Sequence, residues 1–206
     1  MSYFTQEQQA LLAGLAQKAQ GIDNLELTVA RLVHELGPGA EQSFSAGQLA
    51  IIDFCAGECH RQMSGALSVY WMLTAYERAC LLGDNLSVEA MLELGALVEP
   101  LVNRHGFRRT AVTFSNADAT VVIGAENVPS QVASLTTHGG ELSALELYVF
   151  FEEIHPFADG NGRVGAILFN LRGGTMDNPK LPPRIDFAAR RENRLGPVED
   201  FVIGLS

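Results

Sequence analysis

The sequence predicts a mainly α-helical protein, a helical bundle that carries one small β-hairpin. Apolar residues recur at helical spacing over most of the chain, and helix-capping patterns precede several of these segments. Between residues 110 and 128 the pattern changes, and β-branched residues alternate with small polar ones. The chain has 206 residues, of which 47% are apolar, so one domain with a sizeable core is expected.

The first half of the chain is predicted to consist of helices. Thr5 and Gln8 form a capping box, and Leu11, Leu12 and Leu15 follow on one helical face. Further helices are predicted over residues 25–36, 48–61, 66–82 and 87–102. We interpret residues 1–62 as an N-terminal helical extension packed on a core domain of residues 63–206.

The second half is predicted to hold the hairpin and a central pair of helices. Residues 110–128 suit a short hairpin, and residues 136–140, which include His138, are expected to form a flexible link. A helix over residues 142–154 begins at the capping box of Ser143 and Glu146. It must end near Ile154, because Pro156 disfavours a helical His155. A buried apolar helix from Val164 and a last helix from about Asp186 complete the chain.

Composition argues against several classes of protein. The net charge of −10 does not suit a nucleic-acid-binding protein or one that binds an anionic membrane surface. Neither a membrane span nor a secretory signal is visible, so a cytoplasmic location is expected, although a secretion route that uses other signals stays open. Cys55 and Cys59 are interpreted as reduced core thiols rather than metal ligands.

The most informative segment is the run from His155 to Arg163, His-Pro-Phe-Ala-Asp-Gly-Asn-Gly-Arg. It lies between two predicted helices, so it forms a tight loop at a helix N-terminus, where backbone N–H groups favour anions. His155 has an unperturbed pKa suited to removing a proton from a hydroxyl, and Asp159 could hold Mg²⁺ together with phosphate oxygens.

The other residues of the run suit the binding of phosphate. Gly160 can adopt a positive φ, and Gly162 leaves room for a ligand to approach. The Asn161 amide can donate to a phosphate oxygen, and Arg163 offers a planar guanidinium for a further phosphate. Phe157 is expected to be a core anchor. Together these residues predict the transfer of a phosphate-containing group to a hydroxyl.

This run resembles the signature of the Fic (Fido) domain, His-x-Phe-x-(Asp/Glu)-Gly-Asn-Gly-Arg-x-x-Arg, and matches it through Arg163. The weaker resemblance of the surrounding chain extends roughly over residues 65–195. Fic enzymes usually transfer AMP from ATP, with Mg²⁺, to a Ser, Thr or Tyr hydroxyl of a protein. The resemblance implies that His155 is the general base and Asp159 the metal ligand, and that Gly160, Asn161, Gly162 and Arg163 bind the nucleotide.

The resemblance also implies a docking element. Val121, Val122, Ile123 and Gly124 are similar to the family's β-hairpin flap, which binds the target segment by backbone pairing. The expected partners are therefore a nucleotide and a protein substrate that the sequence does not identify. The oligomeric state stays open, with a homo-oligomer among the alternatives.

One position departs from the family pattern. The second arginine of the signature would fall at position 166, which is Ala166 here. Three interpretations stay open: the donor carries two phosphates, as in a CDP- or UDP-linked group; Arg172, Arg190 or Arg191 replaces the missing guanidinium; or catalysis is weakened and the protein is a nucleotide- or protein-binding module. A kinase-like or phosphocholine-transferring relative is a further alternative, and Gly162 and Gly160 argue against each in turn.

Overall fold

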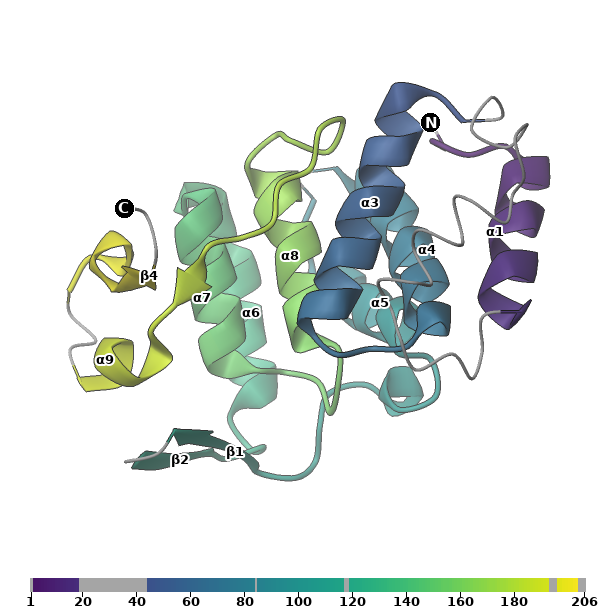
Figure 1. Cartoon of the computed structure of the whole chain (residues 1–206). Coiled ribbons are helices and arrows are strands. Elements are labelled where there is room, and N and C mark those ends of the chain that lie inside the picture. The colour runs from purple at the N-terminus through teal and green to yellow at the C-terminus, as the bar shows by residue number, and fades with distance from the viewer. Residues whose placement is uncertain (1, 19–43, 84, 117–118, 193–195, 204–206) are drawn as a thin grey trace.

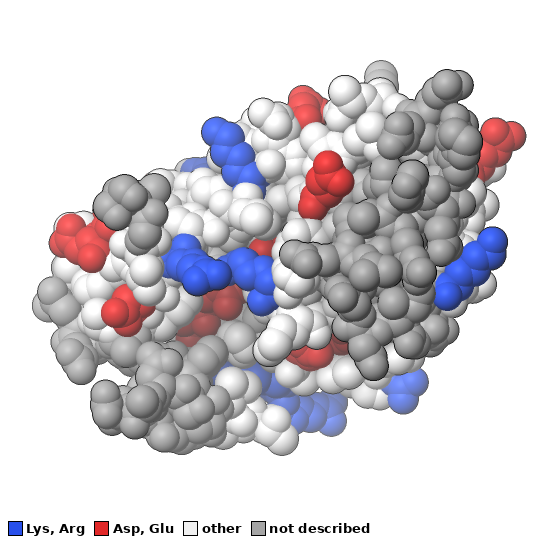
Figure 2. Space-filling view, in the orientation of Figure 1, with Lys and Arg blue, Asp and Glu red and all other residues white. Residues whose placement is uncertain are grey.

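The structure is a computed structural model that describes residues 2–18, 44–83, 85–116, 119–192 and 196–203. Within these residues the fold is mainly helical with one antiparallel β-hairpin, which confirms the predicted fold class. None of the helices in the described ranges is long and apolar enough to cross a membrane. On the face shown in Figure 2, basic side chains lie among acidic ones.

Four helices form the N-terminal half of the described fold: α1 (Gln6–Lys18), α3 (Ala46–Arg61), α4 (Ala66–Leu82) and α5 (Val88–Val98). The predicted helix over residues 25–36 lies outside the described residues. α5 ends at Val98, earlier than predicted, because Pro100 follows Glu99 and holds it outside the helical region at φ −141° and ψ 75°.

The centre of the molecule is a pair of helices, α7 (Ala144–Ile154) and α8 (Asn161–Arg172). Ser143 and Glu146 form the capping box that the sequence predicts at the start of α7. α8 also packs against α3, α4 and α5, so nearly all of its residues are buried. The short link between α7 and α8 lies at the lower end of the pair in Figure 1, at the same end of the molecule as the hairpin.

The hairpin consists of β1 (Val112–Asn116) and β2 (Ala119–Ile123), paired antiparallel with Val112 opposite Ile123. The residues between the two strands, 117–118, are outside the described part of the chain. The segment that follows corrects a prediction. Residues 136–140 were predicted to be a flexible link, but they form the end of helix α6 (Val128–His138) and the start of the 3₁₀ helix η3 (Gly139–Glu141). α6 forms because Pro129 suits a first turn and Val128, Val132 and Leu135 bury one face.

The C-terminal segment is more varied than predicted. The last predicted helix is the short α9 (Phe187–Glu192), followed by the 3₁₀ helix η4 (Val198–Phe201). β3 (Arg184–Ile185) pairs with β4 (Val202–Ile203), and this second, two-residue ladder was not predicted. Ile185, Val198 and Phe201 pack on Tyr148 and Val149, so this segment covers one face of α7.

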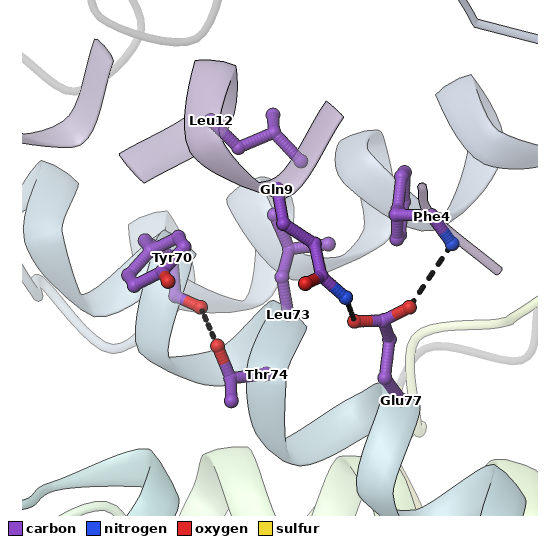
Figure 3. A pocket seen from close by; sticks show the side chains of 7 residues that line it. All are labelled: Phe4, Gln9, Leu12, Tyr70, Leu73, Thr74 and Glu77. Atoms are coloured by element: carbon purple, nitrogen blue, oxygen red, sulfur yellow. Dashed lines mark hydrogen bonds between the residues drawn. The ribbon is translucent and has the colours of Figure 1, made fainter. Parts of the chain in front are cut away.

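The N-terminal helices share their core with the central pair. One cluster of buried side chains extends from Phe4 in the N-terminal segment to Leu171 in α8. A small cavity of about 80 Å³ remains between α1 and α4 (Figure 3). At its edge Glu77 accepts hydrogen bonds from the Phe4 backbone and the Gln9 amide, so this cavity belongs to the packing of α1.

Candidate active site

His155 occupies the turn that leaves α7. Its backbone is left-handed, at φ 48° and ψ 62°, and its N–H still closes the helix on the Phe151 carbonyl. The left-handed region is costly for a non-glycine residue, so surrounding contacts must hold this conformation. The Nδ1 atom of the ring is buried, whereas the side chain as a whole is 22% exposed. The exposed part of this ring therefore does not include Nδ1.

Arg108 holds this turn from a distant part of the sequence. Its Nε donates to the His155 carbonyl at 2.7 Å, its Nη2 donates to the Ile154 carbonyl at 3.3 Å, and its backbone N–H donates to the Pro156 carbonyl at 3.0 Å. Nη1 donates to Thr110, which lies just before β1, so the same guanidinium joins the base of the hairpin to the loop. The Arg108 residue is 4% exposed, and burial lowers its pKa.

The middle of the loop is anchored in the core. Phe157 is fully buried, and its ring lies against Gly95, where an added Cβ would come within 2.3 Å of the ring. The Asn161 side chain closes the loop: its Oδ1 accepts from the Phe157 N–H and its Nδ2 donates to the Phe157 carbonyl, both at 2.9 Å. In this conformation the Asn161 amide is therefore committed to the protein, and a ligand would meet the backbone here.

Gly160 begins α8 with a left-handed backbone at φ 77°. None of the described side chains caps the helix at this residue, so the first N–H groups of α8 are available to an anion. Asn103 supports the same turn, because its Nδ2 donates to the Asp159 carbonyl at 2.8 Å and to the Gly95 carbonyl at 3.0 Å.

Asp159 and Arg163 differ sharply in exposure. The Asp159 side chain is 63% exposed, whereas the Arg163 side chain is 2% exposed. Arg163 Nη2 lies 3.1 Å from Glu99 Oε2 and 3.5 Å from Asp159 Oδ1, and Nη1 donates to the Val98 carbonyl. The guanidinium thus joins the end of α5 to the loop. The Asp159 carboxylate is exposed, and its Oδ1 accepts a hydrogen bond from the Gly160 N–H at 2.6 Å.

The first turn of α8 lies against the end of α3. A Cβ at Gly162 would lie 2.0 Å from the Gln62 amide nitrogen, so Gln62 reaches directly over this glycine. Gly165, one turn further along α8, allows Glu152 and the Tyr148 ring to approach at 2.6 and 3.1 Å from a hypothetical Cβ. Both glycines therefore have a packing role beside any ligand role.

Charged side chains gather behind these two glycines. Glu58 is fully buried and is held by Arg61 through two contacts of 2.8 Å, while Gln62 donates to the same carboxylate at 2.9 Å. Burial raises the pKa of Glu58, and its hydrogen bonds with Arg61 and Gln62 oppose this shift. Burial raises the pKa of Glu152 to about 8, with repulsion from Glu58 as a second cause.

The residues present fit a magnesium ion held with a nucleotide. In the described ranges, no group of three or more His, Cys, Asp or Glu side chains gathers at a metal site. Mg²⁺ does not need such a cage, since it is commonly bound by one or two carboxylates together with phosphate oxygens. The exposed Asp159 carboxylate, beside the uncapped start of α8, meets this requirement.

The loop brings together His155, Asp159, Gly160, Asn161, Gly162 and Arg163. Arg172 lies at the other end of α8 and donates to the Leu142 and Gly140 carbonyls, and Arg190 pairs with Glu153 and the Gly196 carbonyl. Neither occupies the place of the missing guanidinium. Nothing is described of the Arg191 side chain.

Sequence reasoning missed the supporting residues Arg108, Asn103, Glu99, Gln62 and Glu152. Four of these belong to other segments, and no local pattern marks them. Glu152 had a usable signal, since it lies three residues before His155 and hence on the same face of the helix.

Residues 85–172, from just before α5 to the last residue of α8, match a family model described as the Fic/DOC family. Among curated proteins, none matches the chain. The chain therefore contains a Fic/DOC domain, whose matched residues include the whole loop from His155 to Arg163. This family association indicates transfer of nucleotide-containing groups in general.

Proposed function

We propose that this protein transfers AMP, or another phosphate-containing part of a nucleotide, to a Ser, Thr or Tyr hydroxyl of a target protein. One observation carries the proposal: within a Fic/DOC domain, a partly exposed imidazole stands on the loop that opens onto the uncapped N-terminus of a buried helix. A base for the hydroxyl and a site for the phosphates thus lie on the same short loop.

His155 is the base. Its Nε2 takes the proton of the incoming hydroxyl as the oxygen forms a bond to the phosphorus of the transferred group. The bond from this phosphorus to the leaving phosphate oxygen breaks, and with ATP as donor the leaving group is pyrophosphate. The left-handed turn and the Arg108 hydrogen bonds hold the imidazole in place, which reduces the entropy cost of the reactive geometry.

The start of α8 binds the donor. The backbone N–H groups of Asn161, Gly162 and Arg163 lack acceptors within the helix and favour an anion. Mg²⁺, held by Asp159 and donor oxygens, would neutralise charge on the phosphates. Arg163 stabilises the loop through Glu99 and Asp159. In the proposed complex it also contacts a distal phosphate of the donor.

Arg61 is our candidate for the cation that position 166 lacks. Ala166 is fully buried in the core cluster. Arg61 stands at the end of α3, its side chain is 24% exposed, and the next residue, Gln62, covers Gly162. Its two contacts with Glu58 use Nε and Nη2, and the guanidinium also interacts with the Tyr148 side chain. The proposal requires that Nη1 turns toward a donor phosphate when the nucleotide binds.

The hairpin is the proposed docking element for the target. Arg108 ties the segment before β1 to the catalytic loop, so an extended segment that pairs with β2 would approach His155. Backbone pairing at Val121, Val122, Ile123 and Gly124 tolerates many sequences, so the hairpin does not restrict the target to one sequence.

The test is a donor screen with an intact-mass readout. Purified protein, Mg²⁺ and a candidate target mixture are incubated with ATP, CTP, UTP and CDP- or UDP-linked donors. We expect a mass gain on a target or on the protein itself that matches one donor fragment. His155→Ala should reduce this gain by roughly 10²–10⁴-fold.

His138→Ala is the matched control. His138 is the last residue of α6, near the start of α7 and hence at the opposite end of that helix from His155, and it is exposed. This variant should label as well as the wild type. Equal labelling by the wild type and His155→Ala would refute the assignment of the base, and no mass gain with any donor would refute transfer.

The second candidate function is nucleotide binding without turnover. Two observations favour it: Ala166 replaces a guanidinium, and Arg163 is buried against Glu99. Calorimetry with the same nucleotides separates the two functions. Binding at micromolar concentration together with an empty donor screen would support the binding protein over the enzyme.

A further inference from the structure

The Glu152 carboxyl group lies between the catalytic loop and the buried charges of α3. Its Oε2 atom is 3.8 Å from Nδ1 of His155, and its Oε1 atom faces the backbone of Gly165. Oε1 has no hydrogen-bond partner among the residues that the structure describes. A buried polar atom left in this way calls for an explanation, because such atoms are usually paired.

Glu152 does not form a simple structural ion pair with the described groups around it. The nearby charged and titratable groups are Glu58 and Arg61 from α3, Tyr148 from α7 and His155 itself. Arg61 is bound to Glu58 through two nitrogens, and α8 contributes a glycine at this point. The imidazole of His155 is thus the polar group toward which Oε2 is directed.

The orientation of His155 gives this contact a chemical meaning. Nε2 can accept a proton from a hydroxyl only when it carries none, so the neutral ring must hold its proton on the buried Nδ1. A Glu152 oxygen that accepts from Nδ1–H selects this tautomer. When the ring becomes an imidazolium, the same carboxyl group lies beside the new positive charge.

We propose that Glu152 is a positioning residue for His155, which keeps the proton on Nδ1 and stabilises the imidazolium that forms during transfer. The contact must shorten by about 1 Å to become a hydrogen bond. The proposal requires that rotation of the two side chains supplies this movement. The inference rests on the proposed role of His155 as a base, but the Glu152–His155 contact can be measured without activity.

The burial of Glu152 predicts how the pair responds to pH. Because its pKa is raised to about 8, Glu152 holds a proton at neutral pH in the free protein, and the pair titrates as a unit. Above this pH the carboxylate stands beside the ring and favours a proton on Nδ1. The transfer rate of the wild type should therefore keep rising between pH 7 and 9.

The decisive experiment is NMR of protein labelled with ¹⁵N in histidine. The chain has 5 histidines, and the spectrum of His155→Ala assigns the signal of this ring. In the wild type we expect the Nδ1–H tautomer to dominate above pH 8. In Glu152→Gln the upper titration step of the ring should fall by roughly 1–3 pH units, because a nearby carboxylate is lost.

Two variants control the experiment. Glu153→Gln changes the neighbouring carboxylate, which pairs with Arg190, and should leave the His155 titration unchanged. Glu152→Asp keeps a carboxylate on a shorter side chain and should retain part of the shift. Circular dichroism and thermal unfolding establish that each variant is folded.

The outcomes separate the two hypotheses. A His155 titration that stays within about 0.3 pH units of the wild type in folded Glu152→Gln would overturn the positioning role, since a carboxylate at this distance shifts a pKa by more. Transfer activity could then still be present. A shifted titration in a protein that transfers nothing would instead support the pair and refute the proposed reaction.

Discussion

His155 depends on a residue that lies 47 positions before it in the sequence. Arg108 donates hydrogen bonds to the carbonyls of Ile154 and His155 at the end of α7. Without Arg108 these carbonyls would lose this donor. A charged donor that serves several carbonyls stabilises a backbone conformation that the residue would rarely adopt alone. The conformation of the candidate base is thus a property of the Arg108–loop contact as much as of the motif.

We predict that Arg108→Gln lowers the transfer rate by about 10²-fold, because a shift of about 1 Å in the base removes its alignment. The free energy of unfolding should fall by roughly 1–3 kcal/mol as the carbonyls lose their donor. Transfer assays and urea unfolding measure the two effects. Arg109→Gln, at the exposed neighbouring position, is the control and should change neither quantity.

A substitution at Gly162 tests whether this glycine serves nucleotide binding or only the packing of α8 against Gln62. In Gly162→Ala the new Cβ collides with the Gln62 amide, but Gln62 is exposed and can move, so stability should change by less than about 1 kcal/mol. Nucleotide affinity, measured by calorimetry, should fall. If Gln62→Ala restored the affinity of Gly162→Ala, the glycine would serve packing alone, and our assignment of a donor cradle would be wrong.

The buried Glu152 also predicts a pH dependence of stability. The folded protein holds this proton up to a pKa of about 8, whereas the unfolded chain releases it near about 4.3. Between these values the folded state binds more protons, so a rising pH lowers the free energy of unfolding. The contribution is at most about 1.4 kcal/mol per pH unit.

Urea unfolding of the wild type and Glu152→Gln at pH 5, 6, 7 and 8 measures this contribution. The variant should lack it, so its stability relative to the wild type should improve as the pH rises. Parallel curves for the two proteins would show that Glu152 is ionised in the fold at neutral pH.

At the scale of elements, the hairpin and the α7–α8 pair have different proposed roles, target docking and group transfer. The helix pair carries the candidate catalytic residues on its connecting loop, and the ends of α7 follow from local signals such as the Ser143 capping box and Pro156. The hairpin has ten paired residues in a register from Val112–Ile123 to Asn116–Ala119. Within the described residues its two strands pair only with each other, so their outer edges could accept an extended segment.

These different roles predict that substitutions in the hairpin impair transfer to the target but not nucleotide binding. Successive N–H groups of β2 point to opposite edges of the strand, one toward β1 and the next away from it. One of the two substitutions Val121→Pro and Val122→Pro therefore removes an N–H that bonds to β1, and the other removes an N–H on the outer edge. Both variants should lose transfer to the target protein while nucleotide affinity stays unchanged. Val122→Thr keeps the N–H and is the control. Full transfer by both proline variants would exclude docking at this hairpin.

At the scale of the whole molecule, the candidate site extends beyond the matched family segment. Residues 85–172 contain the loop, but Glu58 and Arg61 belong to α3, which packs against α8, and Gln62 directly follows this helix. The core cluster is continuous from the N-terminal segment to α8. The division between residues 62 and 63 therefore remains a prediction, and α3, which lies wholly before it, packs against the candidate site.

We predict that α3 contributes to donor binding through Arg61. The double variant Glu58→Gln/Arg61→Gln removes the guanidinium without leaving a buried carboxylate unpaired. Its Kd for the productive nucleotide should rise by roughly 10–100-fold, which corresponds to one lost charge-assisted contact. Glu58→Gln alone should retain most of the affinity, because Arg61 remains. An unchanged Kd in the double variant would show that the donor does not touch this end of α3.

The sequence alone determined the features whose causes are local. Apolar spacing placed α3 and α4, and the capping box of Ser143 and Glu146 placed the start of α7. The exit at His155 followed from Pro156, and the run to Arg163 indicated the chemistry and the family. The error at α6 had a local cause as well. A short amphipathic helix with Pro at its first turn was obscured by the Thr136-Thr137-His138-Gly139-Gly140 segment, where the sequence suggests a loop.

Only the tertiary structure decided which groups meet. Arg163 and Glu99 are 64 residues apart, and Gly162 faces Gln62 because α3 packs across α8. Whether Asn161 serves a ligand or its own loop, and whether Glu152 keeps its proton, likewise depends on burial and on neighbours from other helices. The pKa of a side chain and the exposure of a guanidinium are properties of the packed surroundings, and no spacing along the chain encodes them.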